Sequence, residues 1–359
     1  MDPSQFQKQY EAIISIIEGN VDGNDDEEAY FASAYFRYQF QMIARLLDTA
    51  SLRLDSIESS EKCPEFTILT QAGYQERLRS PFCSPLPVIL FGSNDPTYCP
   101  LIGLALWLEY TFSEGRELVF ETSNTSTGTA EAKVRKIKNL ACRILSDVQR
   151  STEFINTLED LGLDLDRNRT CGVWNGVRML AAKAAVGMGL CPRDLDYRTE
   201  RNLLRKRSYD DYSEDEDCFS FSNINVGCAL CKGGPVGYKV KPDSKISDSW
   251  ILQNVVPNIS SKLNRAEQRN AVLVLGKALL WKVFEDSSNY VPAEISQRIR
   301  RAYNQVLHAG DEELHAGDDS TEAGDNPIKK VPLVLRHRRS DYTVVIEEEQ
   351  STNRFSLYI

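Results

Sequence analysis

A cationic segment at residues 130–150 holds the densest group of side chains that could contact a phosphate backbone. Its apolar residues recur at helical spacing, and cations fill many of the remaining positions. Five of these cations are candidate DNA contacts: Lys133, Arg135, Lys136, Lys138 and Arg143. The alternative is a solvated polar face opposite a core-facing stripe, and the spacing alone favours this simpler interpretation.

Few side chains of this sequence are suited to bind a metal ion. Cys228 and Cys231 have the spacing of half a zinc site, but no second cysteine pair and no nearby histidine completes it. All 3 histidines lie at or beyond position 308. We therefore expect a structural or fortuitous Cys228-x-x-Cys231 motif, and neither a metal nor a cofactor.

Composition and charge limit the class of protein. The chain has 359 residues, of which 42% are hydrophobic, enough for one large core or two modest ones. Its formal net charge of -10 argues against a surface coated with cations. Acidic runs at 22–28, 210–217 and 311–325 hold much of the negative charge, so the folded core is nearer to neutral.

The sequence predicts neither a membrane protein nor a secreted one. No apolar stretch approaches the roughly 20 residues that a transmembrane helix needs, and the N-terminus has no basic or apolar signal region. The 9 cysteines are an odd number without the spacing of a disulfide framework. We expect an intracellular protein, nuclear or cytoplasmic, with no membrane partner.

Hydrophobic periodicity predicts a mostly α fold with a small antiparallel β-sheet. Helices are expected at 6–18, 28–51, 101–110, 130–150, 151–162, 174–189, 193–207, 262–286 and 293–308. Strands are expected at 65–70, 87–91, 117–121 and 342–346. The segment 309–327 repeats His-Ala-Gly-Asp and is predicted to be a disordered linker.

Four segments, taken in order, carry a resemblance to a known family. They are RLLDTASLRLDSI at 45–57, NDPTYCPLIGLALWL at 94–108, GVWNGVRMLAAKAAVGMG at 172–189 and RSYDDY at 207–212. In this order and at this spacing, they resemble the catalytic domain of tyrosine recombinases of the Crypton type. The second segment, with Cys99-Pro100 opening a helix, is the most specific single match.

The resemblance implies a catalytic set of Arg45, Arg178 and Tyr209. Enzymes of this family attack a DNA phosphodiester with a tyrosine hydroxyl, and a covalent phosphotyrosyl intermediate forms. Two arginines clamp the phosphate, because a guanidinium donates twice to its oxygens and stays charged. Arg45 matches the first arginine, Arg178 the second and Tyr209 the nucleophile.

Three further positions of the family's pattern are not filled in this sequence. The lysine position falls near Gln71 or Ala72, and the histidine position falls on Asn175 or Trp174. A third position, His or Trp in the family, falls near Glu200, whose charge would repel a phosphate. Because loss of a general acid costs about 10²–10⁴-fold, we expect impaired strand cleavage.

Each residue of the implied catalytic set also has a simpler interpretation. Arg45 could be an ordinary arginine on a helix face. Arg178 lies between apolar neighbours on a small-residue helix, and a buried arginine needs an anionic partner, which favours the phosphate position. Tyr209 lies in an acidic stretch with Tyr197 and Tyr212 as competitors, and tyrosines in such stretches are usually solvated.

The sequence therefore predicts a DNA-binding protein descended from a mobile-element recombinase and catalytically impaired. An active recombinase and an interaction scaffold without nucleic acid are the alternatives. Duplex DNA is the expected partner, and the resemblance implies homo-oligomers on DNA. Five regions are expected: a helical segment at 1–42, a recombinase-like core at 43–245, a helical region at 246–308, an acidic linker at 309–330 and a tail at 331–359.

Overall fold

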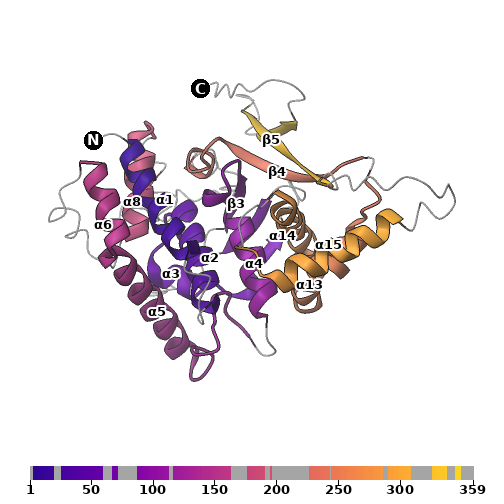
Figure 1. The fold of residues 1–359 in the computed structure, drawn as a ribbon, viewed down its shortest axis with the longest axis horizontal. Coiled ribbons are helices and arrows are strands. Elements are labelled where there is room, and N and C mark those ends of the chain that lie inside the picture. The colour runs from indigo at the N-terminus through magenta and orange to yellow at the C-terminus, as the bar shows by residue number, and fades with distance from the viewer. Residues whose placement is uncertain are drawn as a thin grey trace, which may run out of the picture.

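The computed structural model is mostly helical with a smaller antiparallel sheet (Figure 1), which confirms the coarse fold class expected from the sequence. The structure describes residues 3–19, 26–59, 67–71, 87–112, 116–162, 176–190, 195, 226–242, 244–285, 290–308, 326–337 and 344–348.

The first helices are α1 (Pro3–Gly19), α2 (Asp26–Met42) and α3 (Leu46–Ala50). The expectation of one helix over 28–51 is wrong, because Ile43 adopts a φ of 51° and ends α2. A β-branched residue rarely takes this left-handed conformation. The chain therefore turns at 43–45 and begins a separate short helix.

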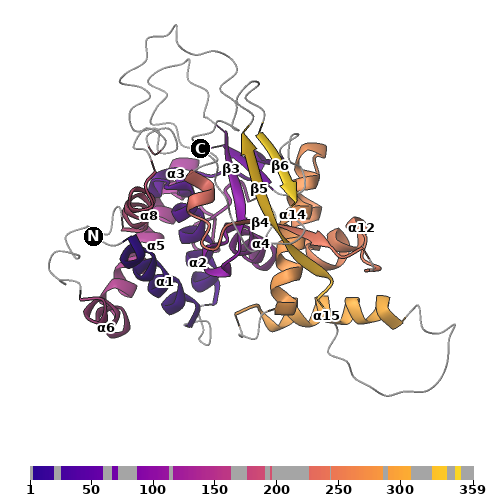
Figure 2. The same cartoon turned by 90° about the horizontal axis from the view of Figure 1, so that it is seen from above.

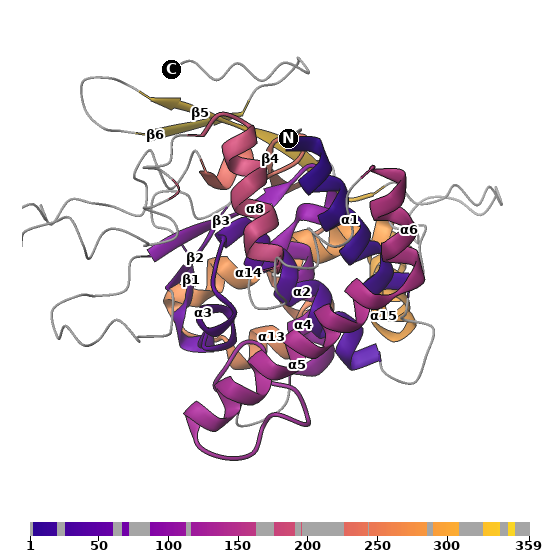
Figure 3. The same cartoon turned by 90° about the vertical axis from the view of Figure 1, so that its left-hand side faces the viewer.

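Four further helices follow in the first half of the chain: α4 (Pro100–Thr111), α5 (Ala130–Arg150), α6 (Thr152–Asp160) and α8 (Gly176–Gly187). The Thr129 side chain accepts a hydrogen bond from the N–H of Ala132 and so caps α5. Ser151 caps α6 in the same way through Phe154. Figure 3 shows α8 lying along α1, with α5 and α6 beside them.

The sheet follows chain order and is antiparallel throughout. Its strands are β1 (Ile57–Ser59), β2 (Thr67–Gln71), β3 (Pro87–Ser93), β4 (Pro235–Val240), β5 (Ile328–His337) and β6 (Val344–Glu348). β3 and β4 pair only through Gly92 and Ser93, opposite Val236 and Pro235. β5 begins at Ile328, within the range that the sequence assigned to a linker, and its first five residues, Ile328–Pro332, pair with β4, whereas Leu333–His337 pair with β6.

The expectation of a strand at 117–121 is wrong. Leu118 forms one isolated bridge with Arg53, and the N–H of Val119 donates to the carbonyl of Leu52 at 2.8 Å. The following residues fold back on themselves, since the N–H of Thr122 donates to the Thr125 hydroxyl at 2.7 Å. Local hydrogen bonds therefore replace a ladder in this segment.

The C-terminal helices are α12 (Asp248–Trp250), the π-helical turn η6 (Ile251–Val255), α13 (Pro257–Lys262), α14 (Ala266–Glu285) and α15 (Ala293–His308). Helix α14 contacts α4 and also β1, β4 and β5, so it joins the helical part to the sheet (Figure 2). A methyl group at Gly276 would lie 2.6 Å from Ile251, which shows how closely α14 meets η6.

One hydrophobic cluster runs through both halves of the chain. It extends from Phe6 in α1 through Trp107 in α4 to Leu279 in α14, all of them buried. The residues expected as a separate segment at 1–42 share this cluster with the rest of the core. Within the described ranges, no helix combines the length and the apolar character needed to cross a membrane.

Candidate functional site

Helix α8 brings Arg178 against the segment that carries Arg45. The Arg178 side chain is 5% exposed, and its Nε donates to the carbonyl oxygen of Ile43 at 3.1 Å. Ile43 lies two residues before Arg45 and 135 positions before Arg178. Two of the three residues implied by the recombinase resemblance therefore belong to adjoining segments.

The bond from Arg178 also has a structural role at the end of α2. The last carbonyls of a helix have no partner within it, and the helix dipole favours a cation at this end. Because the left-handed Ile43 ends α2, its carbonyl is available to a neighbouring donor, and Arg178 supplies one. Removal of Arg178 will therefore disturb both the end of α2 and the neighbourhood of Arg45.

Small side chains explain why α8 can lie so close to its neighbours. Ala181, Ala184 and Ala185 are fully buried on the face that meets α1 and α2. At the start of the helix, a methyl group on Gly176 would lie 3.0 Å from Leu145 of α5. Contacts on these two sides hold the position of Arg178.

Arg45 lies just before α3 and is half-buried. Its carbonyl oxygen accepts hydrogen bonds from the N–H of Thr49 at 3.0 Å and from the Thr49 hydroxyl at 3.1 Å. These bonds fix the backbone of Arg45 at the start of α3. Within the described ranges, its guanidinium forms no hydrogen bond or ion pair with another side chain.

The third implied residue, Tyr209, lies outside the described residues, as do Ala72, Trp174, Asn175 and Glu200. Gln71 is the last residue of β2, paired with Pro87. The convergence of Arg45, Arg178 and Tyr209 in one cleft therefore stays a prediction.

The cations of α5 differ in what they contact. Lys133 pairs with the buried carboxylate of Glu121 at 2.8 Å, and its own side chain is only 14% exposed. Arg143 pairs with Glu28 of α2. These two candidate DNA contacts hold α5 to the rest of the molecule.

The other three candidates on this helix differ in their exposure and contacts. Lys136 donates to the carbonyl and hydroxyl oxygens of Thr127 at 3.0 and 2.9 Å, which tethers the loop before the helix. Lys138 is half-buried and lies close to Cys142. Arg135 is exposed on the surface of α5, as are Lys136 and Arg143, but within the described ranges its side chain forms no hydrogen bond or ion pair.

A buried arginine that the sequence did not single out lies in α2. Arg37 is 1% exposed and donates to the Thr97 carbonyl at 3.1 Å, to Ser33 and to Glu18. Burial lowers the pKa of Arg37, but the Glu18 carboxylate outweighs this effect and holds it above its usual value. The sequence feature that could have indicated this buried arginine is its position as the one cation in a helix rich in aromatic residues.

A second missed cluster joins α4 to the C-terminal helices. Glu109 is 1% exposed, and its carboxylate accepts from Arg298 Nη2 at 2.7 Å and from the N–H groups of Asn258 and Ile259 at 3.2 and 3.3 Å. Burial raises the pKa of Glu109 to about 7, with Arg298 opposing the shift. This carboxylate holds α13 and α15 against α4.

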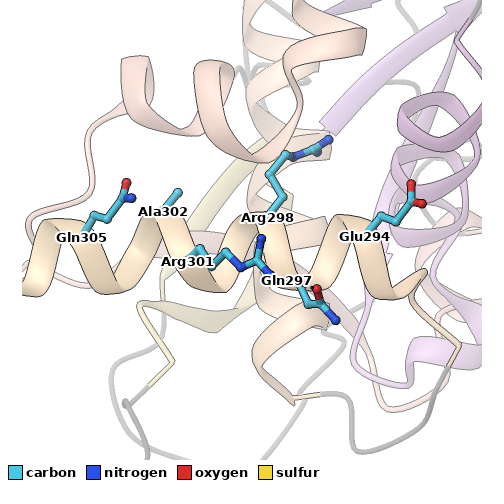
Figure 4. Close-up of a pocket in the computed structure, with 6 residues that line it drawn as sticks. All are labelled: Glu294, Gln297, Arg298, Arg301, Ala302 and Gln305. Atoms are coloured by element: carbon cyan, nitrogen blue, oxygen red, sulfur yellow. Dashed lines mark hydrogen bonds between the residues drawn. The ribbon is translucent and has the colours of Figure 1, made fainter.

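A hollow of about 450 Å³ lies along α15 (Figure 4). The residues that line it are Glu294, Gln297, Arg298, Arg301, Ala302 and Gln305. All of them belong to one helix, and Arg298 is turned towards the neighbouring elements, where Glu109 and the carbonyl of Val255 accept its hydrogen bonds. The hollow is a surface groove without a set of groups arranged for catalysis.

Neither the known family models, nor the curated proteins, nor the solved structures include a match to this chain. In the part of the chain that the structure describes, no three histidine, cysteine or acidic side chains are grouped as a metal site would require.

Proposed function

We propose that this chain binds duplex DNA as a descendant of a mobile-element tyrosine recombinase whose strand-cleaving chemistry is impaired. The observation that carries the proposal is the 3.1 Å bond from Arg178 to Ile43, two residues from Arg45. The resemblance to Crypton-type recombinases requires these two distant segments to meet. Their contact supports that resemblance independently of the sequence pattern.

The chemistry of the two arginines suits a phosphate. A guanidinium presents parallel N–H donors that match phosphate oxygens, and it remains charged at every physiological pH. The exposed Arg135 of α5 would add a contact to the DNA backbone outside the Arg45 and Arg178 neighbourhood. The protein would act in the nucleus or the cytoplasm and assemble as a homo-oligomer on DNA.

We propose DNA binding rather than DNA cleavage, because two catalytic positions of the recombinase family hold no group that can transfer a proton in this sequence. The position of the family's histidine holds Asn175 or Trp174, and no lysine lies between Lys62 and Lys133. An amide cannot exchange a proton with the leaving oxygen at neutral pH. The loss of one such group typically reduces a rate by about 10²–10⁴-fold.

The test is a gel-shift series with arbitrary duplex DNA over a range of salt concentrations. We expect the logarithm of the binding constant to fall linearly with the logarithm of salt concentration. Arg45→Ala should reduce that slope by about 1, the effect of losing one phosphate contact. Arg53→Ala is the matched control, because Arg53 is exposed and already paired with Asp55 at 2.9 Å.

Arg178 needs a gentler substitution because it also completes the end of α2. Arg178→Lys keeps the charge but loses the planar pair of donors, so we expect weaker binding with an unchanged circular dichroism spectrum. Absence of salt-dependent binding by the folded wild-type protein would refute the proposal and favour an interaction scaffold.

A nicked suicide duplex separates an impaired protein from an active recombinase. A covalent protein–DNA adduct that disappears in Tyr209→Phe would show that cleavage survives. We expect no adduct from the wild-type protein under conditions in which it shifts the same duplex. An adduct would contradict the impaired chemistry while leaving DNA binding in place.

A further inference from the structure

Cys228 and Cys231 lie at the two ends of one tight turn ahead of β4. The N–H of Cys231 donates to the carbonyl of Cys228 at 3.1 Å, and a turn of this kind keeps its end Cα atoms within about 7 Å. A disulfide requires Cα atoms roughly 4.4–6.8 Å apart. Both side chains are thiols in this structure. The turn therefore keeps the two Cα atoms within about the separation that a disulfide spans.

The two sulfur atoms have different environments. Cys231 is 3% exposed, and its Sγ accepts a hydrogen bond from Gln41 Nε2 at 3.1 Å and donates to the Gly227 carbonyl at 3.2 Å. Cys228 is only half-buried, so solutes can reach it. An accessible thiol followed by a shielded one is the arrangement that dithiol redox sites use, with the first attacking and the second resolving.

We propose that Cys228 and Cys231 are a reversible dithiol–disulfide pair that peroxide oxidises through Cys228. The Cys228 thiolate attacks one peroxide oxygen, the O–O bond breaks, and the departing hydroxide takes up the proton that the thiol released. Cys228 is then a sulfenic acid. The Cys231 sulfur attacks the Cys228 sulfur, the S–O bond breaks, and the leaving hydroxide takes the Cys231 proton.

The two thiols together lose two electrons and two protons, and one peroxide becomes two waters. Reduction uses a low-molecular-weight thiol, which attacks the disulfide to form a mixed disulfide. A second molecule of the same thiol then releases the cysteine and leaves as its own disulfide.

Oxidation would alter the junction between α2 and the sheet. The disulfide removes the hydrogen atom from the Cys231 sulfur, so its bond to the Gly227 carbonyl is lost. The same Gln41 that donates to Cys231 also bonds both the N–H and the carbonyl of Phe91 in β3, each at 2.9 Å. A change at Cys231 therefore reaches the side chain that holds α2 to β3. No part of this inference rests on the proposed DNA binding.

The experiment treats the reduced full-length protein with hydrogen peroxide, alkylates the remaining thiols and maps the peptides by mass spectrometry. We expect residues 228–231 to lose the mass of two hydrogen atoms and to regain two alkylatable thiols after dithiothreitol. Cys218→Ser is the matched control, since Cys218 is the nearest other cysteine in the sequence, and it should leave the result unchanged.

Two further variants test the order of the steps. Cys231→Ser should accumulate a sulfenic acid at Cys228 that dimedone traps, because the resolving thiol is gone. Cys228→Ser should leave Cys231 unmodified, since that sulfur is shielded. Cys142 is a half-buried thiol with a pKa raised by burial, and it should react more slowly than Cys228.

Peptide mapping of the peroxide-treated wild-type protein needs no substitution, so the proposal can be tested even if a variant fails to fold. Three results would overturn the proposal. They are no peroxide-dependent change at residues 228–231, a disulfide from Cys228 to a different cysteine, and oxidation of Cys228 beyond sulfenic acid without a disulfide in the wild-type protein.

Discussion

Positive charge occupies two contrasting environments in this molecule, the interior beside α1 and α2 and the face of α5. Arg37 lies in the interior at 1% exposure, held by the Glu18 carboxylate, Ser33 and a backbone carbonyl. On α5, Lys133 and the exposed Arg143 also pair with carboxylates, whereas the exposed Arg135 forms no ion pair within the described ranges.

The partner of a cation, rather than the number of cations along its helix, decides what that cation can bind. A cation that already holds a carboxylate must break that contact before it can bind a phosphate. On this basis, Arg135 is a stronger candidate for DNA contact than Lys133, although both lie on the same basic helix.

Removal of the charge opposite Arg37 should have the largest effect on stability. Glu18→Gln leaves a buried guanidinium without its counter-ion, and breaking such a pair typically costs about 3–5 kcal/mol. The free energy of unfolding, measured by urea titration, should fall by this amount. Glu159→Gln makes the same chemical change at an exposed position of α6 and should leave the unfolding midpoint in place. Equal effects of the two substitutions would contradict the interior role of Arg37.

The Glu109 carboxylate should make stability depend on pH. Its pKa is about 7 in the folded protein and 4.5 in its ordinary state, so between these values the folded protein holds a proton that the unfolded chain has released. The contribution of Glu109 to stability is therefore most favourable below pH 4.5 and is lost as pH rises through 7, by at most about 3 kcal/mol.

Comparison with Glu109→Gln isolates this dependence, because the amide does not titrate. The difference in unfolding free energy between the wild-type protein and the variant should change between pH 5 and pH 8, with the wild-type protein losing stability relative to the variant as pH rises. If the unfolding free energies of the two proteins change with pH in parallel, the pKa of Glu109 is not raised in the folded protein.

Lys133→Met should cost about 1–3 kcal/mol, because it leaves a buried charged acceptor without its cation. Among the described residues, Glu121 would keep the N–H groups of Glu117 and Leu118 as donors, at 3.3 and 3.4 Å, and the charge of Arg116 nearby. Thermal unfolding measures the loss, and Lys136→Met is the matched control on the same helix. Unchanged stability together with weaker DNA binding would instead place Lys133 among the DNA contacts.

Arg135→Ala should have the smallest effect on stability and a specific effect on binding. Its side chain is exposed, so the unfolding midpoint should not move. The slope of the binding constant against salt should fall by about 1 if Arg135 neutralises one phosphate. Arg143→Ala is the comparison, and its slope should change less because Glu28 already holds that side chain. A larger fall in slope for Arg143→Ala than for Arg135→Ala would show that the ion pair with Glu28 does not keep Arg143 from binding DNA.

The sequence predicted elements best where apolar periodicity was long and local. Helix α5 occupies Ala130–Arg150, the range expected from its spacing, and the paired strands β2 and β3 lie close to the expected 65–70 and 87–91. The break at Ile43 was missed, since its left-handed backbone accompanies a contact with Arg178, 135 positions away. The expected strand at 117–121 failed because its pairing stops at one bridge between Arg53 and Leu118, and the N–H of Glu121 turns back to the carbonyl of Leu118.

What the sequence alone determined was the helical class of the fold, most of its helices and which side chains carry charge. These follow from interactions among residues three or four positions apart. Only the tertiary structure decided which charges are neutralised, since Arg143 meets Glu28 and Glu109 meets Arg298 across long stretches of chain. Periodicity places a side chain on a face, but the desolvation and pairing of a charge depend on whichever distant segment folds against that face.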